Sequence, residues 1–240
     1  MTAATDLTRA SAVVLAGGRG TRLQTVVADR PKVLADVQGR PFLTYVLDPL
    51  SAAGGGTIVL CTGHLGEQVQ ETLGPAYGTR PLTYAQEPHP LGTGGALRAV
   101  LPQLHSDPVL VLNGDSYCPA DLGALWAWHA ARGEASGTLL LTHVDDTRRY
   151  GQVAVDADGC IERFVEKGTR GGPGWINAGI YVLSRRLLTA IPAGRAVSLE
   201  REVFPAWVGR GLHGLSGPDR FLDIGTPLSY QAAQQFGAWS

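Results

Sequence analysis

The apolar run Ala12–Ala16 passes directly into a glycine-rich loop, and this transition limits the possible folds more than any other part of the sequence. Glycine can adopt positive φ angles and bring backbone N–H groups close to a ligand, which is how a loop binds an anion. Arg22 and Lys32 stand at the two ends of the segment that follows, and Pro31 favours an extended chain just before Lys32. The pattern predicts a first β-strand that ends in a triphosphate-binding loop.

The loop does not match either of the common phosphate-binding motifs. A Walker A loop would end in Gly-Lys-Ser/Thr, and a dinucleotide fingerprint would have a third glycine where Leu23 stands. The loop instead resembles the signature of the sugar-phosphate nucleotidyltransferases, G-G-x-G-T-R-L followed by P-K, which is filled from Gly17 to Leu23 and at Pro31 and Lys32. This resemblance extends in order to about Phe236, and it implies that a nucleoside triphosphate and a sugar 1-phosphate are joined with release of pyrophosphate.

Strand and helix patterns alternate over the first half of the chain, which is typical of a doubly wound, mostly parallel α/β sheet of Rossmann-like type. Strands are predicted at Ala12–Ala16, Thr57–Thr62, Leu82–Gln86 and Val109–Asn113, and helices at Phe42–Ala53, Leu65–Leu73 and Ala96–Leu104. Short strands follow at Thr138–His143, Gln152–Val155, Ile161–Glu166 and Ile176–Leu183, before two closing helices capped by Ser198 and by Thr226 with Pro227. We expect one domain over residues 1–240, with a nucleotide-binding core (about 12–132) and a small antiparallel sugar-binding lobe with the closing helices (about 133–240).

Composition narrows the partners. The net charge of −1 over 240 residues provides no basic surface of the kind that nucleic-acid-binding proteins need, so small molecules are expected instead. The oligomeric state cannot be predicted. Cys61, Cys118 and Cys160 are odd in number and lack a C-x-x-C spacing, so neither a disulfide framework nor a zinc site is expected. No apolar stretch reaches about 18 residues and no signal-peptide pattern opens the chain, so a cytoplasmic location without membrane contact is predicted.

A second glycine-rich segment, Glu87–Ala96, enters a predicted helix through two prolines. The resemblance assigns this segment to the base and ribose of the nucleotide. The backbone around Gly17 and Gly92, with the side chain of Gln86 or Glu87, would hold the base. The N-terminus of the helix would also favour a phosphate, because its dipole attracts negative charge.

Two aspartates are candidate metal ligands. Asp115 follows the buried strand Val109–Asn113, and Asp223 lies in a late L-D-I-G-T segment. Mg²⁺ prefers oxygen ligands and, beside a triphosphate, takes only one or two carboxylates from the protein. The family has a metal aspartate at each of these places, so the resemblance implies that Asp115 and Asp223 bind Mg²⁺. The alternative for each is an aspartate that only caps a turn.

The sugar side of the site is expected in three segments of the second half, which contain Y-G, F-V-E-K and W-I-N-A-G-I. Carboxylate and amide side chains hydrogen-bond to sugar hydroxyls, and a neighbouring lysine can neutralise the sugar phosphate. By resemblance, the contacts to the sugar phosphate are Tyr150, Gly151, Glu166, Lys167, Asn177 and Gly179.

The chemistry needs no catalytic histidine or serine. A phosphate monoester has a second pKa of about 6, so at neutral pH its oxygen can attack the α-phosphorus without a general base. The enzyme must hold two polyanions in line and stabilise the charge on the reacting oxygens. We assign Arg22 to the β- and γ-phosphates, Lys32 to the α-phosphate and Lys167 to the sugar phosphate. The expected nucleotide contacts are Leu15, Ala16, Gly17, Gly18, Arg19, Gly20, Thr21, Arg22, Lys32, Gln86, Glu87, Gly92, Thr93, Asn113 and Gly114.

The expected substrates are GTP and D-glycero-D-manno-heptose 1-phosphate, because within the family the chain most resembles the short enzymes that guanylylate this heptose. Mannose 1-phosphate guanylyltransferases and hexose 1-phosphate uridylyl- or thymidylyltransferases share most of the same residues. Glu87 can only accept hydrogen bonds when ionised, so it suits the adjacent N1–H and N2–H₂ donors of guanine. Gln86, which is both donor and acceptor, would also tolerate a pyrimidine.

Two other classes of protein are alternatives to this enzyme. A glycosyltransferase usually presents its metal through a D-x-D motif, and Asp115-Ser116-Tyr117 has no second acid. A non-catalytic protein that binds sugar nucleotides would be expected to lack a cation or a metal ligand. All five expected groups are present here, at Arg22, Lys32, Asp115, Lys167 and Asp223.

Overall fold

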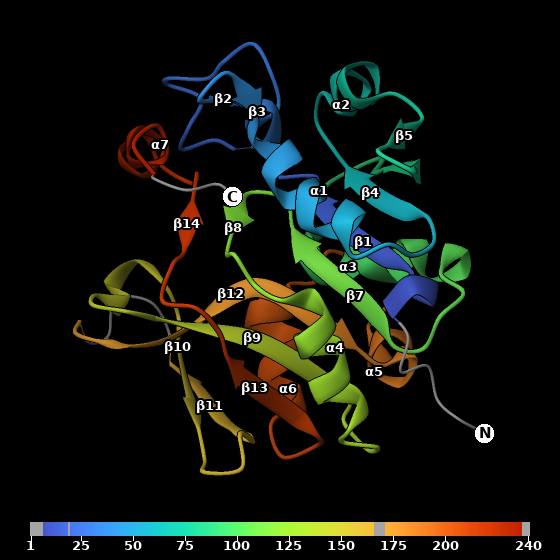
Figure 1. The fold of residues 1–240 in the computed structure, drawn as a ribbon, viewed down its shortest axis with the longest axis vertical. Coiled ribbons are helices and arrows are strands. Elements are labelled where there is room, and N and C mark those ends of the chain that lie inside the picture. The colour runs from blue at the N-terminus through green and yellow to red at the C-terminus, as the bar shows by residue number, and fades with distance from the viewer. Residues whose placement is uncertain (1–6, 19, 166–170, 237–240) are drawn as a thin grey trace.

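The main element of the protein is a ten-stranded mixed sheet (Figure 1). The structure is a computed structural model, and it describes residues 7–18, 20–165 and 171–236. Its strands are β1 (Ala12–Ala16), β4 (Ile58–Thr62), β5 (Ala76–Tyr77), β6 (Arg80–Gln86), β7 (Val109–Asn113), β9 (Gly137–Val144), β10 (Gln152–Val155), β11 (Ile161–Val165), β12 (Gly174–Leu183) and β13 (Leu212–Ser216). The order is β11-β10-β12-β7-β1-β4-β6-β5, and β9 pairs with both β12 and β13. The predicted α/β fold is confirmed.

Four parallel strands, β7, β1, β4 and β6, form the centre of the sheet. Val14 of β1 pairs with Leu60 of β4 and with Leu112 of β7. These three residues pack into one hydrophobic cluster, whereas the adjacent Val13 packs into a second cluster. Because successive strand residues point to opposite faces, both faces of the central sheet are buried, which explains the continuous apolar runs.

The helices divide between the two faces. They are α1 (Phe42–Ala52), α2 (Gly66–Leu73), α3 (Gly92–Val100), α4 (Leu122–Ala130), α5 (Arg185–Ala190), α6 (Phe204–Trp207) and α7 (Pro227–Ala233). Buried residues of α1, α2, α4 and α7 belong to the same cluster as Val14, and those of α3, α5 and α6 belong to the other. The N-caps at Ser198 and Thr226 are confirmed, since each side chain accepts a backbone N–H three residues on. Ser198 opens a π-helical turn (Leu199–Val203) rather than a regular α-helix.

The second half of the chain extends the same sheet. β12 lies antiparallel to β7, with Ile180 opposite Leu112, and it also pairs with β9 and β10 (Figure 1). The change of rhythm predicted at about residue 133 falls between α4 and β9, so it marks a change from parallel to antiparallel pairing within one sheet. Of the helices described, none has the length and hydropathy to cross a membrane.

The start of α3 depends on a glycine that no other residue can replace without strain. Gly92 has φ +69°, and a Cβ built on it would lie 2.6 Å from the carbonyl oxygen of Val197. We expect Gly92→Ala to lower the free energy of unfolding by at least about 1–2 kcal/mol, because a left-handed conformation costs this much and the Val197 backbone must also move. Urea denaturation measures the effect. Gly133→Ala is the control, since a Cβ there meets nothing within 4 Å, and an equal loss in both variants would contradict the prediction.

Candidate active site

The predicted nucleotide-binding residues gather at one edge of the sheet, where the central parallel strands end. The glycine loop follows β1, Gln86 and Glu87 end or follow β6, and Gly114 with Asp115 follows β7. Gly114 N donates to Leu15 O at 2.9 Å, which joins the ends of β7 and β1. This is the edge at which parallel α/β sheets bind their ligands.

A cleft of about 520 Å³ opens at this edge. Its lining consists of Gly17, Thr21, Gln24, Gly63, His64, Leu65, Gln86, Glu87, Pro88, His89 and Pro90. The side chain of Glu87 lies so close to Gly17 that its Oε1 would touch a Cβ built on that glycine. Its Oε2 accepts from Leu91 N at 2.7 Å. Burial raises the pKa of Glu87, and the Leu91 N–H partly offsets this rise. Glu87 is therefore held at the cleft wall, beside the glycine loop.

The N-terminus of α3 is not open to a phosphate at two of its amides, so the prediction of a phosphate there is wrong for them. Gly94 N and Gly95 N both donate to Val197 O, at 2.9 and 3.3 Å. The hydroxyl of Thr93 accepts from Leu199 N at 2.8 Å and donates to Glu200 Oε2 at 2.9 Å. The dipole of this helix is thus satisfied by a protein carbonyl from the segment before the π-helical turn.

On the other side of the glycine loop, basic and acidic groups meet around Gly225. Lys32 Nζ donates to Asp115 Oδ2 at 2.6 Å, and the Lys32 side chain is only 12% exposed. A Cβ built on Gly225 would lie 3.6 Å from Lys32 Nζ, 3.7 Å from Arg22 Nη2 and 2.6 Å from Asp223 Oδ1. The two predicted phosphate-binding cations and the second aspartate therefore converge in one place.

The two aspartates are brought together by a short antiparallel ladder. β8 (Ser116–Tyr117) pairs with β14 (Leu222–Asp223), so that Asp223 lies opposite Ser116. Ile224 N also donates to Asp115 O at 3.1 Å. Residues 108 positions apart in the sequence thus become neighbours, and their role as a pair of metal ligands stays a prediction.

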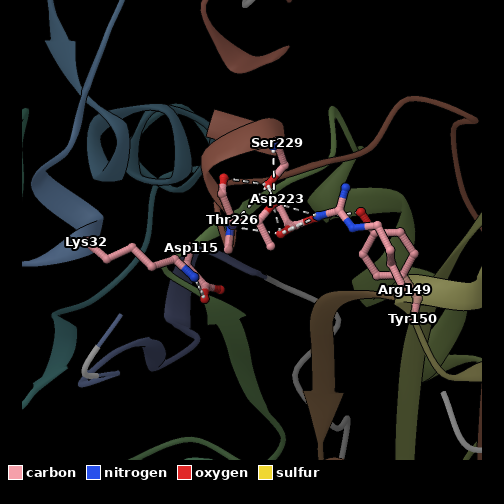
Figure 2. Close-up of polar contacts among 8 residues, drawn as sticks. Lys32, Asp115, Arg149, Tyr150, Asp223, Thr226 and Ser229 are labelled. Carbon is pink, nitrogen blue, oxygen red and sulfur yellow. Dashed lines mark hydrogen bonds and ion pairs between the residues drawn. The ribbon is translucent and has the colours of Figure 1, made fainter. Parts of the chain in front are cut away.

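Asp223 has a dense set of partners (Figure 2). Its Oδ2 accepts from Tyr150 OH and from Arg149 Nη2, the latter at 3.1 Å, and its Oδ1 accepts from Gly225 N at 2.8 Å. Burial and the hydrogen bond to Asp223 raise the pKa of Tyr150, so the phenol keeps its proton and donates to the carboxylate. Figure 2 shows Lys32 and Asp115 on one side of Asp223, with Arg149 and Tyr150 on the other.

The sugar side is only partly visible in the described residues. Arg19, Glu166 and Lys167 lie outside them, so their predicted roles remain predictions. Asn177 Nδ2 donates to Tyr181 OH, and Asn177 Oδ1 accepts from Gly179 N, both at 2.9 Å. A Cβ built on Gly179 would lie 2.6 Å from Ser116 Oγ, which places this bend of β12 against the segment after Asp115.

Some polar groups at this edge have no partner within the described part of the chain. Asn113 Oδ1 and Ser116 Oγ are buried there without a hydrogen bond. Unpaired buried polar atoms are costly, so a bound ligand or water that pairs with them would be favoured. These two residues flank Asp115 closely in sequence, and they add polar groups to the candidate site.

Sequence reasoning missed two residues of the site. Arg149 reaches Asp223, 74 positions away, and its only sequence signal is that it directly precedes Tyr150. Glu200 accepts from the hydroxyls of both Thr93 and Ser198 at 2.9 Å. The only feature of the sequence that pointed to Glu200 was its position in the first turn of a predicted helix. Both contacts depend on segments that the fold brings together.

Comparison with known proteins agrees with this geometry. The chain matches the family described as nucleotidyl transferase over residues 11–238. A mannose-1-phosphate guanylyltransferase of Mycobacterium tuberculosis is 38% identical over 224 residues, which cover 91% of this chain and 62% of that protein. A D-glycero-α-D-manno-heptose 1-phosphate guanylyltransferase of Aneurinibacillus thermoaerophilus is 31% identical over 225 residues, which cover 93% of this chain and 96% of that protein. The chain spans about three fifths of the mannose-1-phosphate guanylyltransferases that it matches.

Solved structures show the same fold. HddC from Yersinia pseudotuberculosis superposes with a TM-score of 0.82 at 30% identity, covering 94% of this chain and 98% of HddC. A second HddC structure, complexed with GMP-PN, superposes with a TM-score of 0.81. The resemblance read from the glycine loop and the later motifs is confirmed, and the chain belongs to the nucleotidyl transferase family.

Proposed function

We propose that this protein transfers a guanylyl group from GTP to a sugar 1-phosphate, giving a GDP-sugar and pyrophosphate. The observation that carries the proposal is the convergence of Arg22, Lys32, Asp115 and Asp223 beside a cleft large enough for a nucleotide. Two cations and two acids in one place suit a phosphoryl transfer, because the phosphoryl oxygens are highly charged in its transition state.

The described residues support a mechanism of positioning and charge stabilisation. The sugar phosphate is largely deprotonated at neutral pH and attacks the α-phosphorus, and the bond to the β-phosphate breaks. In this scheme Lys32 stabilises the charge that grows on the α-phosphoryl oxygens, and Arg22 holds the pyrophosphate that leaves. No group in this scheme has to remove a proton.

The residues fit Mg²⁺ as the metal. Asp223 lies in the β8–β14 ladder and Asp115 directly precedes β8, so the two provide hard oxygen donors from neighbouring segments. Each is paired with a protein cation. No group of three or more His, Cys, Asp or Glu side chains forms a metal cage among the described residues. Mg²⁺ takes few protein ligands and keeps water and phosphate oxygens, so two carboxylates are enough for the proposed site. When bound, the ion would supply positive charge at the phosphate oxygens.

The sugar that we propose is D-glycero-D-manno-heptose 1-phosphate. It is supported by the heptose 1-phosphate guanylyltransferase relative. It is also supported by four motifs that resemble these enzymes and that begin at Gly92, Asn113, Ile176 and Phe221. Mannose 1-phosphate is the second candidate, because the relative from Mycobacterium tuberculosis named for it is 38% identical.

One panel of assays tests the reaction and both substrates. GTP, ATP, UTP and dTTP are each mixed with heptose, mannose and glucose 1-phosphates in the presence of Mg²⁺, and pyrophosphate release is measured. GTP with heptose 1-phosphate should give the highest kcat/KM. Turnover that needs an NDP-sugar and an acceptor would identify a glycosyltransferase. Nucleotide-sugar binding without turnover of any pair would identify a non-catalytic binding protein.

The choice of base should depend on Glu87. We expect Glu87→Gln to reduce the preference for GTP over UTP by about tenfold or more, because a lost charged hydrogen bond to guanine is worth roughly 1.5–3 kcal/mol. The comparison of kcat/KM for the four triphosphates measures this. Glu71→Gln, an exposed change on α2, is the control. A GTP preference that Glu87→Gln leaves intact would mean that Gln86 or the backbone reads the base.

The same variant tests the ionisation of Glu87. Because burial raises its pKa, the carboxylate takes up a proton at a higher pH than an ordinary glutamate. The protonated form cannot accept from both guanine donors, so the KM for GTP should rise as the pH falls through this pKa. In Glu87→Gln this part of the rise in the KM for GTP should be missing, while the part caused by protonation of GTP itself should remain.

A further inference from the structure

Asp223 is paired with a protein cation that has no assigned role. Arg149 Nη2 lies 3.1 Å from Asp223 Oδ2 and 3.4 Å from Thr226 Oγ1. The Arg149 side chain is 44% exposed, whereas that of Asp223 is only 18% exposed. The guanidinium therefore approaches a largely covered carboxylate from the solvent side, opposite Lys32 and Asp115 (Figure 2).

This contact competes with a metal ion. An ionised carboxylate has about four acceptor positions, and those on Asp223 Oδ2 are used by Arg149 and by Tyr150. A divalent cation bound to Asp223 would also stand beside the charged guanidinium, and like charges at such a separation repel. Tyr150 is neutral and can keep its hydrogen bond, so Arg149 is the group that has to leave.

The released side chain would lie close to the expected position of an anion. Arg149 directly precedes Tyr150-Gly151, the segment that the family resemblance gives to the sugar phosphate. A guanidinium matches the geometry of a phosphate better than an ammonium does, because it can donate two parallel hydrogen bonds. The incoming phosphate must also pass close to Asp223 to reach the metal-bound nucleotide.

We propose that Arg149 is a counter-ion that the metal displaces from Asp223, and that the displaced guanidinium then binds the phosphate of the sugar 1-phosphate. Before the metal arrives, Arg149 balances the charge of Asp223 and keeps the carboxylate oriented. Afterwards the same side chain favours binding of the second substrate, so that metal loading precedes tight binding of the sugar phosphate. The second step rests on the proposed function, whereas the first does not.

The test of the first step measures metal binding without turnover. Mn²⁺ is titrated into the protein with GTP but no sugar phosphate, and free Mn²⁺ is followed by electron paramagnetic resonance. Arg149→Gln should bind Mn²⁺ more tightly, by about threefold to tenfold, because the competing charge is gone. Arg148→Gln is the matched control: Arg148 carries the same charge one residue earlier, but it pairs with Asp146 at 2.6 Å and is 72% exposed. It should bind Mn²⁺ as the wild type does.

The second step is tested by kinetics with mannose 1-phosphate and heptose 1-phosphate. Arg149→Gln should raise the KM for the sugar phosphate by about tenfold while leaving the KM for GTP within about twofold. Arg149→Lys keeps the charge but loses the forked geometry, so it should show near wild-type Mn²⁺ binding and still a raised KM. Thermal melts of all variants confirm that they are folded.

The outcomes separate the two hypotheses. Unchanged or weaker Mn²⁺ binding in Arg149→Gln would overturn the displacement, since a purely structural contact would orient Asp223 and favour the metal. Tighter Mn²⁺ binding with an unchanged KM for the sugar phosphate would overturn the second step. If the wild type releases no pyrophosphate with any substrate pair, the proposed function fails, and the Mn²⁺ titration still decides the role of Arg149 at Asp223.

Discussion

Replacing Lys32 with methionine should lower kcat by about 10²-fold or more, equivalent to roughly 3 kcal/mol of lost transition-state stabilisation. Methionine keeps most of the side-chain volume and removes only the charge. The side chain is 12% exposed and its ammonium contacts Asp115, so its charge is held in a fixed place beside the expected phosphates. Pyrophosphate release at saturating GTP and sugar phosphate measures the effect.

The fold should survive this change, because Asp115 is 43% exposed and can be solvated when its partner is lost. Arg30→Met is the control, since Arg30 lies in the same loop but is paired with the exposed Asp29, at 2.8 Å. It should keep near wild-type kcat. A Lys32→Met variant with a raised KM for GTP and an unchanged kcat would show that Lys32 binds the nucleotide equally in the ground and transition states.

The central strands could be predicted almost residue by residue. β1 and β7 have the predicted bounds, because a strand buried on both faces is a continuous apolar run that ends where polar or glycine residues begin. The start of α3 was predicted four residues too late, at Ala96 rather than Gly92. Glycines oppose helix formation locally, and here they are accepted because the helix start packs against the Val197 backbone.

The second half was less predictable because its pairing is not local. β13 contains a glycine and a histidine and was not recognised, yet it completes the sheet beside β9. The sequence of β12 does not indicate that this strand runs antiparallel beside β7. Such pairings are set by packing among distant segments, which local propensity does not record.

The candidate site divides in the same way. The glycine loop, Lys32 and Asp115 are local motifs, and each could be found from its own neighbours. The occupied amides of α3 and the contact of Arg149 with Asp223 could not be found in this way. Val197 lies 103 positions after Gly94 in the sequence, and Asp223 lies 74 positions after Arg149. A helix N-terminus predicts a place for negative charge, and a protein carbonyl can fill that place as well as a phosphate.

Asp223→Asn should also lower kcat by about 10²-fold or more, and it should raise the Mg²⁺ concentration needed for half-maximal activity. This substitution separates the two possible roles of the residue. Asp223 Oδ1 accepts from Gly225 N at 2.8 Å, so the residue does cap the turn that leads into α7. Asparagine keeps an oxygen for that hydrogen bond, while it loses the charge and replaces the Oδ2 acceptor of Tyr150 and Arg149 with an NH₂ group. A residue that merely caps the turn would tolerate this change in kcat.

The measurement is kcat as a function of Mg²⁺ concentration, with thermal denaturation as the check on folding. Asp219→Asn, an exposed change four residues earlier, should leave both quantities near those of the wild type. If Asp223→Asn reaches wild-type kcat at saturating Mg²⁺, the charge of Asp223 has no part in the reaction.

The Asp223→Asn variant also loses the ion pair with Arg149, whose guanidinium lies 3.1 Å from the carboxylate in the wild type. The Arg149 side chain should then no longer respond to metal binding. Mn²⁺ binding in Asp223→Asn should therefore be the same with and without the additional change Arg149→Gln, since the two residues act through one contact.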